Sequence, residues 1–401
     1  MKKIEFKSML VSIILVLIIY YFYTPALNIH AIEFWIFIIV ALCIYGASTS
    51  YSTLLGKKFK PEKVGYLGVA VAVIVAGILV TDLFTSKIFH ASRYASRIEV
   101  ENVKFNNKTL HEVDFSKTPI IDRKSTVKLG DKVMGEIPEY VSQFEVSDDY
   151  TQISYKNSVY RVTPLEYASF FKYLTNSKNG IPAYITVNST NGKAEIVKLK
   201  DLGLDGMKYV PSAILNHNLN RKLQLTYPTS IFGSPSFEID EKGHPWYVCT
   251  TYTYFGVENK KQVTGAVLFD PITGKSKKYD KDKVPKWVDR VYPEELIMTE
   301  IDENGSLQDG FFNSVLGQKN VTVTSEGYNY LEKDGDIWIY SGITSANKDS
   351  SNLGFVLSNL RTHQTLRFSC SGANEKAAMK SAEGEVKNYG YDATFPLLVN
   401  V

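Results

Sequence analysis

The sequence predicts an α+β protein in which three N-terminal transmembrane helices precede repeated units of a helix and an antiparallel sheet. Residues 66–84 carry no charge before Asp82 and are long enough to cross a hydrocarbon core of about 30 Å as a helix. Two shorter apolar runs lie before this segment. The chain after it is polar, and its alternating apolar residues and dipeptide turns are typical of antiparallel strands.

Length and composition limit the class of protein. The chain has 401 residues, which suggests more than one domain, and its 26 Tyr and 21 Phe favour β-structure. Its 45 basic and 42 acidic residues are well mixed, which argues against a nucleic-acid partner. Cys249 and Cys370 lie beyond the apolar runs, so a disulfide scaffold is excluded, although a bond between these two stays open.

Residues 1–86 are expected to anchor the chain in the membrane through helices at Met9–Tyr23, at 32–45 with an extension toward Ser50, and at 66–84. A signal peptide is the rival interpretation of the first run, because basic residues precede it: Lys2, Lys3 and Lys7. It is disfavoured because no small-residue cleavage site follows and two further apolar runs do. The runs hold almost no ionisable residues, so an anchor is favoured over a transporter or channel.

The basic residues around these runs set the expected orientation. Residues 24–31, between the first two runs, hold neither Lys nor Arg. The loop before the third run is basic and holds Lys57, Lys58, Lys60 and Lys63. The positive-inside rule therefore places the N-terminus and residues 51–64 in the cytoplasm and the large C-terminal region outside it. The expected location is the cell membrane, crossed several times, with the lipid bilayer as the first partner.

Residues 87–141 are expected to connect the anchor to the folded body. Residues 86–100 read as a short amphipathic continuation of the third helix. Arg93 and Arg97 are spaced for one face of that helix, where we expect them to meet solvent or lipid headgroups.

The first α+β unit is placed at residues 142–228. Residues 144–162 alternate as a β-hairpin that turns at Lys156-Asn157. A helix is predicted from Thr163 to about Leu174, because Thr163 can cap it and Pro164 suits its first position. Two strands follow around the turn Asn191-Gly192, at 181–187 and 193–199.

A second unit at 229–320 and a third at 321–401 are expected to repeat these elements. The second has hairpins within 237–252 and 264–279 and a helix at 287–300. The third has hairpins within 328–344 and 353–369 and a helix at 374–387. Residues 391–401 read as a strand without a partner in the sequence. Such a strand inserts into an existing sheet, belongs to a truncated unit, or is completed by another protein.

One hairpin carries a resemblance to a known family. Residues 265–279 read GAVLFDPITGKSKKY, and Asp270 with Thr273-Gly274-Lys275 resembles the D-x-x-TG-K hairpin of PepSY-type modules. The resemblance covers 160–200, 236–300 and 328–401, and in the third copy Asn359 and Thr362-His363-Gln364 replace these residues. As a whole, the chain is similar to uncharacterised multi-pass membrane proteins of low-GC Gram-positive bacteria with such repeats outside the membrane. The resemblance implies an interaction or inhibitory module in the cell envelope.

Five aromatic residues are the candidate ligand-binding residues. Side chains two residues apart on a strand share a face, which groups Trp246, Tyr252 and Tyr254 on one strand and its extension, and Trp338 and Tyr340 on another. Such faces stack against glycan rings or grip an extended peptide. The alternative is cross-strand packing in the core.

No catalytic or metal-binding motif stands out, so no catalytic residue, metal or cofactor is predicted. The six histidines lack the spacing of a zinc site, and Asp302-x-Asn304-Gly305-Ser306 lacks the later ligands of a calcium loop. Glu294 and Glu295 follow Pro293, where the dipole of a helix start explains two adjacent carboxylates.

Two functions remain after these exclusions. The first is a membrane-anchored extracytoplasmic module that binds a protein or a cell-wall glycan through its sheets. The alternative is an envelope enzyme that acts on glycan or peptide at an unrecognised site between the repeats. Carboxylates with perturbed pKa values in a shared cleft would favour the enzyme. An apolar groove or an open sheet edge would favour the binding module.

Overall fold

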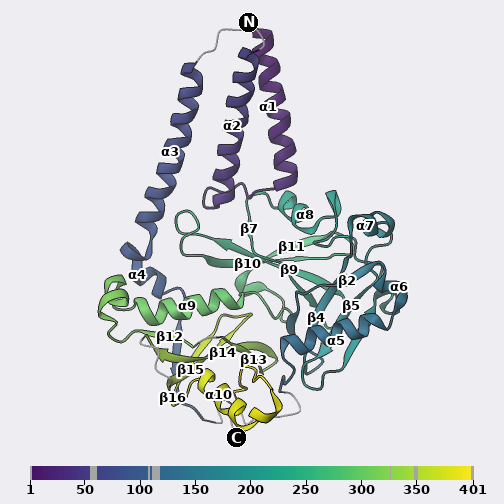
Figure 1. Cartoon of the computed structure of the whole chain (residues 1–401), viewed down its shortest axis with the longest axis vertical. Coiled ribbons are helices and arrows are strands. Elements are labelled where there is room, and N and C mark those ends of the chain that lie inside the picture. The colour runs from purple at the N-terminus through teal and green to yellow at the C-terminus, as the bar shows by residue number, and fades with distance from the viewer. Residues whose placement is uncertain are drawn as a thin grey trace.

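The computed structural model of the chain describes residues 2–54, 61–106, 109–110, 118–325, 327–346 and 351–398. Long helices rise from one end of a folded body, and the C-terminal end of the chain lies at the opposite end of that body (Figure 1). Within the described ranges the body holds three mainly antiparallel sheets with helices beside them, so the fold is α+β.

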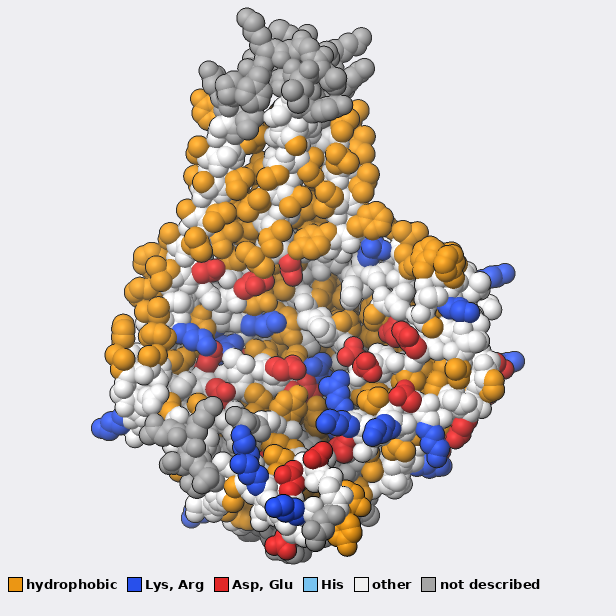
Figure 2. All heavy atoms as spheres, in the orientation of Figure 1, with side chains coloured by type: hydrophobic (Ala, Val, Ile, Leu, Met, Phe, Trp, Pro, Cys, Tyr) orange, Lys and Arg blue, Asp and Glu red, His pale blue; other side chains and the backbone are white. Residues whose placement is uncertain are grey.

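The helical end consists of α1 (Lys2–Tyr23), α2 (Ile32–Leu54) and α3 (Pro61–Thr85). Two segments are long and apolar enough to cross a membrane, Ile32–Ser50 and Gly65–Thr85, and the apolar part of α1, Met9–Tyr23, is shorter. Hydrophobic side chains cover the outside of this end (Figure 2). None of the hydropathy window in α3 is buried, unlike the core helix of a soluble protein. By length and composition, membrane anchoring is compatible with this end.

The side chains of the basic residues that set the predicted orientation are not described by the structure. Lys57, Lys58 and Lys60 fall between α2 and α3, in residues 55–60. Lys63 and the lysines of the first turns of α1 belong to helices, but their side chains are not described.

Hydrogen bonds join the body to the body-proximal ends of α1, α2 and α3 at two places. At the first, Leu27 N, between α1 and α2, donates to Pro228 O at 2.7 Å. At the second, His30 Nδ1 donates to Gly256 O at 2.6 Å and Asn259 Nδ2 donates to Asp82 O at 2.9 Å. The second place is the tip of a long hairpin, which therefore sits between the α1–α2 connection and the end of α3.

Each sheet contains a four-stranded meander. The first consists of β3 (Thr151–Tyr155), β4 (Ser158–Tyr167), β5 (Ala183–Asn188) and β6 (Ala194–Lys198). The second consists of β8 (Ser236–Ile239), β9 (Pro245–Thr253), β10 (Gln262–Phe269) and β11 (Ser276–Asp280). The third consists of β13 (Asn329–Lys333), β14 (Asp336–Ser345), β15 (Ser351–Asn359) and β16 (Thr365–Ala373).

A short extra strand pairs with the second strand of every meander. These strands are β2 (Phe144–Val146) beside β4, β7 (Ile231–Phe232) beside β9, and β12 (Thr322–Thr324) beside β14. The third sheet also gains β1 (Val100–Val103), which runs parallel to β16. The three sheets therefore share one strand order, apart from this parallel edge.

The β10–β11 turn explains why Asp270, Thr273 and Gly274 stand at these positions. Asp270 Oδ1 accepts from the N–H groups of Ile272 at 2.8 Å and Thr273 at 3.2 Å, and Oδ2 accepts from Thr273 Oγ1 at 2.6 Å. The backbone then turns through Gly274, whose φ is +71°. This is a side-chain-closed turn of the kind that Asp and Asn form.

The last hairpins of the other two sheets close in the same way. Asn188 Oδ1 and Asn359 Oδ1 each accept from the N–H groups of the second and third residues that follow. The fourth residue that follows has a positive φ in both, Gly192 at +73° and His363 at +67°. Asn can therefore replace Asp in this turn, and His363 can occupy the left-handed position.

Helices cover the sheets and fill the junctions between them. They are α4 (Lys87–Ala95), α5 (Arg123–Gly135), α6 (Pro138–Val141), α7 (Phe170–Asn176), α8 (Leu219–Thr226), α9 (Glu294–Leu307) and α10 (Glu375–Glu385). Of these, α9 matters most for the site. Its Ile297 and Ile301 pack in one core with the second sheet and the third, through residues such as Leu268 and Ile339.

The predicted helix at 163–174 is wrong over its first half. Thr163 and Pro164 belong to β4, where they pair with β5. On the side of β4 opposite β5, the paired strand is β3 up to Val162 and β2 from Leu165 onward. Pro164 lies between these two pairings, so the N–H that proline lacks is not needed for a hydrogen bond to either strand. The helix begins at Phe170, capped by Ser169 Oγ, which accepts from Lys172 N.

Two further elements differ from their predictions. The helix predicted at 287–300 begins only at Glu294, after Pro293, and Glu294 and Glu295 occupy its first turn as expected. Residues 391–398 form no strand, although they pack against the third sheet, where Tyr340 Oη donates to Pro396 O at 2.7 Å. The predicted strand at 391–401 is therefore wrong within the described residues, and residues 399–401 lie outside them.

Candidate juxtamembrane binding pocket

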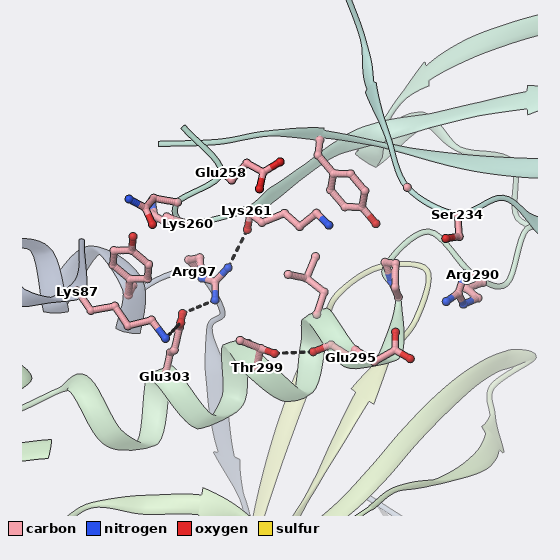
Figure 3. Close-up of a pocket in the computed structure, with 16 residues that line it drawn as sticks. Lys87, Arg97, Ser234, Glu258, Lys260, Lys261, Arg290, Glu295, Thr299 and Glu303 are labelled. Carbon is pink, nitrogen blue, oxygen red and sulfur yellow. Dashed lines mark hydrogen bonds and ion pairs between the residues drawn. The ribbon is translucent and has the colours of Figure 1, made fainter. Parts of the chain in front are cut away.

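A pocket of about 480 Å³ lies where α4, the β9–β10 hairpin and α9 meet, next to the end of α3. The hairpin tip forms one wall, α4 and the residues after it form another, and α9 forms the floor (Figure 3). We call it the juxtamembrane pocket. Its charged lining residues are Lys87, Arg97, Glu258, Lys260, Lys261, Arg290, Glu295 and Glu303.

Local backbone geometry points these side chains at one space. On α9, Glu295, Thr299 and Glu303 follow one another at intervals of four residues, which places them on one helix face. At the hairpin tip, Glu258 and Lys260 adopt φ angles of +60° and +44°, so the chain reverses within a few residues.

Arg97 joins the walls of the pocket. Its guanidinium pairs with the carboxylate of Glu303, and Nη1 donates to Lys261 O at 2.8 Å. Glu303 also pairs with Lys87 at 2.6 Å, as Figure 3 shows. The Arg97 side chain is only 3% exposed. The expectation that Arg97 meets solvent or headgroups is therefore wrong. Its partner, the buried carboxylate of Glu303 on α9, lies far from Arg97 in the sequence, so the residues around Arg97 could not predict the pair.

One donor of Arg97 remains unused. Its Nε is buried and has no hydrogen-bond partner among the described residues. Buried donors without a partner are uncommon in native proteins, because each one loses its bond to water.

Lys260 and Lys261 bring positive charge without a matching carboxylate. Among the described residues neither lies within ion-pair distance of an acidic side chain, and Lys261 Nζ instead lies 4.3 Å from the centre of the Tyr252 ring. Burial, followed by the charges of Arg93 and Arg97, lowers the pKa of Lys260. Arg93 and Arg97 thus contribute positive potential at Lys260, which the charge of Glu300 partly opposes.

The lining as a whole carries five Lys or Arg and three Glu, a surplus of two positive charges. Arg290 is already paired with Glu294 at 2.8 Å, just outside the pocket. Among the described residues that line the pocket there is neither a histidine nor a cysteine. The surplus of positive charge is suited to holding an acidic group.

The structure brings only some of the five aromatic candidates to this pocket. Tyr252 lines it, and the Tyr254 ring lies 5.9 Å from Lys261 Nζ. Trp246 packs beside Trp287 in the core between the second sheet and α9. The remaining two, Trp338 and Tyr340, are buried in a separate core on the third sheet.

Sequence reasoning missed most of the pocket. Its basic residues come from α4 and the hairpin tip, and Arg97 and Glu303 are 206 positions apart in the chain. The one local signal was the pair Lys260-Lys261 next to aromatic strand residues, which was not singled out.

The carboxyls with the most perturbed pKa values lie elsewhere. Glu238 Oε2 accepts from Asp289 N at 2.8 Å, and Asp289 Oδ2 accepts from Ser154 N at 2.8 Å. Burial raises the pKa of both carboxyls, and the negative charge of Glu238 raises that of Asp289 further. This buried pair joins the first two sheets to the segment before α9 and is outside the juxtamembrane pocket.

The other candidate motifs have structural roles. Asp302 lies within α9 and its Oδ1 accepts from Thr324 N at 2.6 Å, while Asn304 Nδ2 donates to Ala95 O at 2.9 Å. Throughout the described ranges, no three His, Cys, Asp or Glu residues cluster as metal ligands. Cys249 is buried and Cys370 is exposed, and both are free thiols.

Comparisons with protein-family models, with curated proteins and with solved structures found no match to this chain.

Proposed function

We propose that this chain is a membrane-anchored protein whose folded body binds an acidic component of the cell envelope in the juxtamembrane pocket. The observation that carries the proposal is the surplus of positive charge at a preformed cavity. Lys260 and Lys261 lack carboxylate partners among the described residues, and the buried Arg97 retains an unused donor. Phosphate and carboxylate groups match such donors in charge and in hydrogen bonding.

The proposed topology has three membrane helices, with Met9–Tyr23 as the first, and a body outside the cytoplasm. The support is the basic residues between the second and third helices and their absence between the first two. A body on that side faces lipid headgroups and wall polymers, many of which are acidic.

The three sheets are proposed to be copies of one PepSY-like unit. Their shared strand order and the matching turns at Asn188, Asp270 and Asn359 support this relationship. In that case the second copy contributes the hairpin wall of the pocket, and α9, which precedes the third copy, contributes its floor.

The enzyme alternative finds less support. An envelope enzyme would be favoured by a cleft that holds carboxylates with perturbed pKa values. The two carboxyls with strongly raised pKa values, Glu238 and Asp289, are instead buried and lie outside the pocket. Backbone N–H groups bind both carboxyls, which fits a structural role.

A ligand-dependent thermal shift tests the proposal. The purified full chain in detergent is mixed with glycerol 1-phosphate or, separately, with phosphatidylglycerol. We expect either probe to raise the unfolding temperature of the wild type, because a ligand that binds only the folded state stabilises it. Replacing both Lys260 and Lys261 by Gln should weaken binding by about tenfold or more, which corresponds to about 1.4 kcal/mol.

The matched control removes the same charge elsewhere. Lys277 and Lys278 are exposed on β11, away from the pocket, and the double Gln variant should respond like the wild type. Equal responses of the two double variants, or no response of the wild type to either probe, would refute the proposal. A response to phosphatidylglycerol alone would identify a lipid source for the acidic group.

A further inference from the structure

We infer that two apolar shoulders of the body rest in the headgroup region of the same membrane that the helices cross. The first shoulder consists of Ile88 and Phe89 on α4 with Phe312, Val315 and Leu316 at the turn after α9. The second consists of Phe170, Phe171 and Leu174 on α7 with Leu215. The inference depends on the membrane anchoring proposed above but not on the ligand.

The exposure of these side chains is unusual for a folded body. Leu316 is 79% exposed, Phe171 73% and Phe312 66%. Single exposed apolar residues are common on protein surfaces, but grouped ones mark an interaction site.

The position of the two shoulders next to the long apolar helices indicates that lipid is their partner. Figure 1 places α4 directly below α3, and α7 and α8 on the other side, below α1. In Figure 2 hydrophobic side chains continue from the long helices onto both sides of the upper body. Apolar side chains therefore lie both along the helices and on the two sides of the body next to them (Figure 2).

Direct contacts hold the first shoulder at the helix end. The rings of Phe84, in α3, and Phe89 stack with centres 5.7 Å apart. Phe311 and Ala91 pack against the small core that α4 forms with the end of α9. The turn that carries Phe312 and Leu316 is therefore connected to the end of α3 through α4.

The nearby charges suit a headgroup region. Lys172 and Lys178 belong to α7 or follow it, and Lys87 and Lys319 lie close in sequence to the residues of the first shoulder. Aromatic and aliphatic side chains that enter the interface, with lysines reaching the headgroups, are typical of proteins that lie on membranes.

Quenching by spin-labelled lipids tests the inference. The full chain, with Cys43 and Cys370 replaced by Ser and the buried Cys249 kept, is given one new cysteine at Leu316, Phe171, Val73 or Leu353. Each variant is labelled with an environment-sensitive fluorophore and reconstituted into vesicles of phosphatidylcholine and phosphatidylglycerol. Val73, on α3, reports on the anchor, and Leu353 is an exposed apolar control on β15.

We expect nitroxides near the headgroups to quench the labels at Leu316 and Phe171 several-fold more than the label at Leu353. Nitroxides deep in the acyl chains should quench the label at Val73. If Val73 is quenched but Leu316 and Phe171 are as open to aqueous iodide as Leu353, the shoulders do not touch lipid, and a protein partner absent from the vesicles becomes the better candidate. If the label at Val73 is not quenched, the proposed membrane anchoring is refuted, and the inference that the shoulders touch lipid is refuted with it.

Discussion

At the scale of single residues, the buried carboxyl pair Glu238 and Asp289 makes stability depend on pH. Burial raises the pKa of both groups, so the folded protein holds their protons more tightly than the unfolded chain does. Their contribution to stability is complete below the unfolded pKa values of about 4 and is lost as the pH rises through the folded values.

We therefore expect Glu238→Gln to reduce the loss of stability between pH 5 and pH 8. Asp289 N and Arg290 N donate to different oxygens of Glu238, so the amide keeps one of these two hydrogen bonds and loses the other. Position 238 no longer gains a negative charge as the pH rises, and Asp289 is the member of the pair that still titrates. A pKa difference of one between folded and unfolded states is worth about 1.4 kcal/mol, so the change is measurable as unfolding temperature against pH. The exposed Glu241→Gln is the control and should leave the profile unchanged. Parallel profiles for wild type and Glu238→Gln would show that the pair does not titrate in this range.

At the scale of elements, the sequence predicts hairpins better than helices. Turns such as Lys156-Asn157 and Asn191-Gly192 were predicted because left-handed backbone positions, such as Asn157 and Gly192, favour Asn, Asp and Gly locally. The helix at Thr163 was wrong because its capping pattern, also local, is overridden by the pairing of β4 with β5. The start of α9 was shifted because Pro293 outweighs the apolar pattern before it.

The matching turns give a prediction for the β10–β11 hairpin. Asp270→Ala removes three hydrogen bonds and should lower the free energy of unfolding by about 1–3 kcal/mol. Asp270→Asn should cost less than Asp270→Ala, because Asn already closes the corresponding turns at Asn188 and Asn359. Thermal unfolding of the full chain measures both variants.

A control for this experiment lies on the same hairpin. Among the described residues, Asp280, whose side chain is 72% exposed, pairs only with the exposed Lys283, so Asp280→Ala should change stability by less than about 0.5 kcal/mol. If Asp270→Asn is as damaging as Asp270→Ala, the three turns are not interchangeable and the proposal of three related units loses its strongest support.

At the scale of the whole molecule, the side of the membrane that holds the body can be tested with the native cysteines. Cys370 is exposed on the third sheet, Cys249 is buried, and Cys43 lies within α2. A membrane-impermeant maleimide should label intact cells that express the wild type and should not label Cys370→Ser. Labelling that appears only after lysis would place the body in the cytoplasm and direct the search for ligands there.

The pocket forms between segments that are far apart in the chain, and for this reason it could not be predicted from the sequence. Each wall is a local element that could be recognised, such as the amphipathic continuation of α3 or the second hairpin. Their meeting depends on the packing of α4 against α9, through Tyr94 and Leu307, and on the anchoring of the hairpin tip at Asp82. Neither contact can be predicted from the residues that are close to it in the sequence.

The bond between Asn259 and Asp82 has a mechanical consequence. A transmembrane helix changes its tilt when the bilayer becomes thinner or thicker. Because α3 holds the hairpin tip through Asp82 and Thr85 and continues into α4, a change in its tilt acts on two walls of the pocket. With the membrane anchoring and the acidic ligand proposed above, we expect the thickness of the bilayer to change the width of the pocket, and ligand affinity in vesicles of short-chain and long-chain lipids would record that coupling.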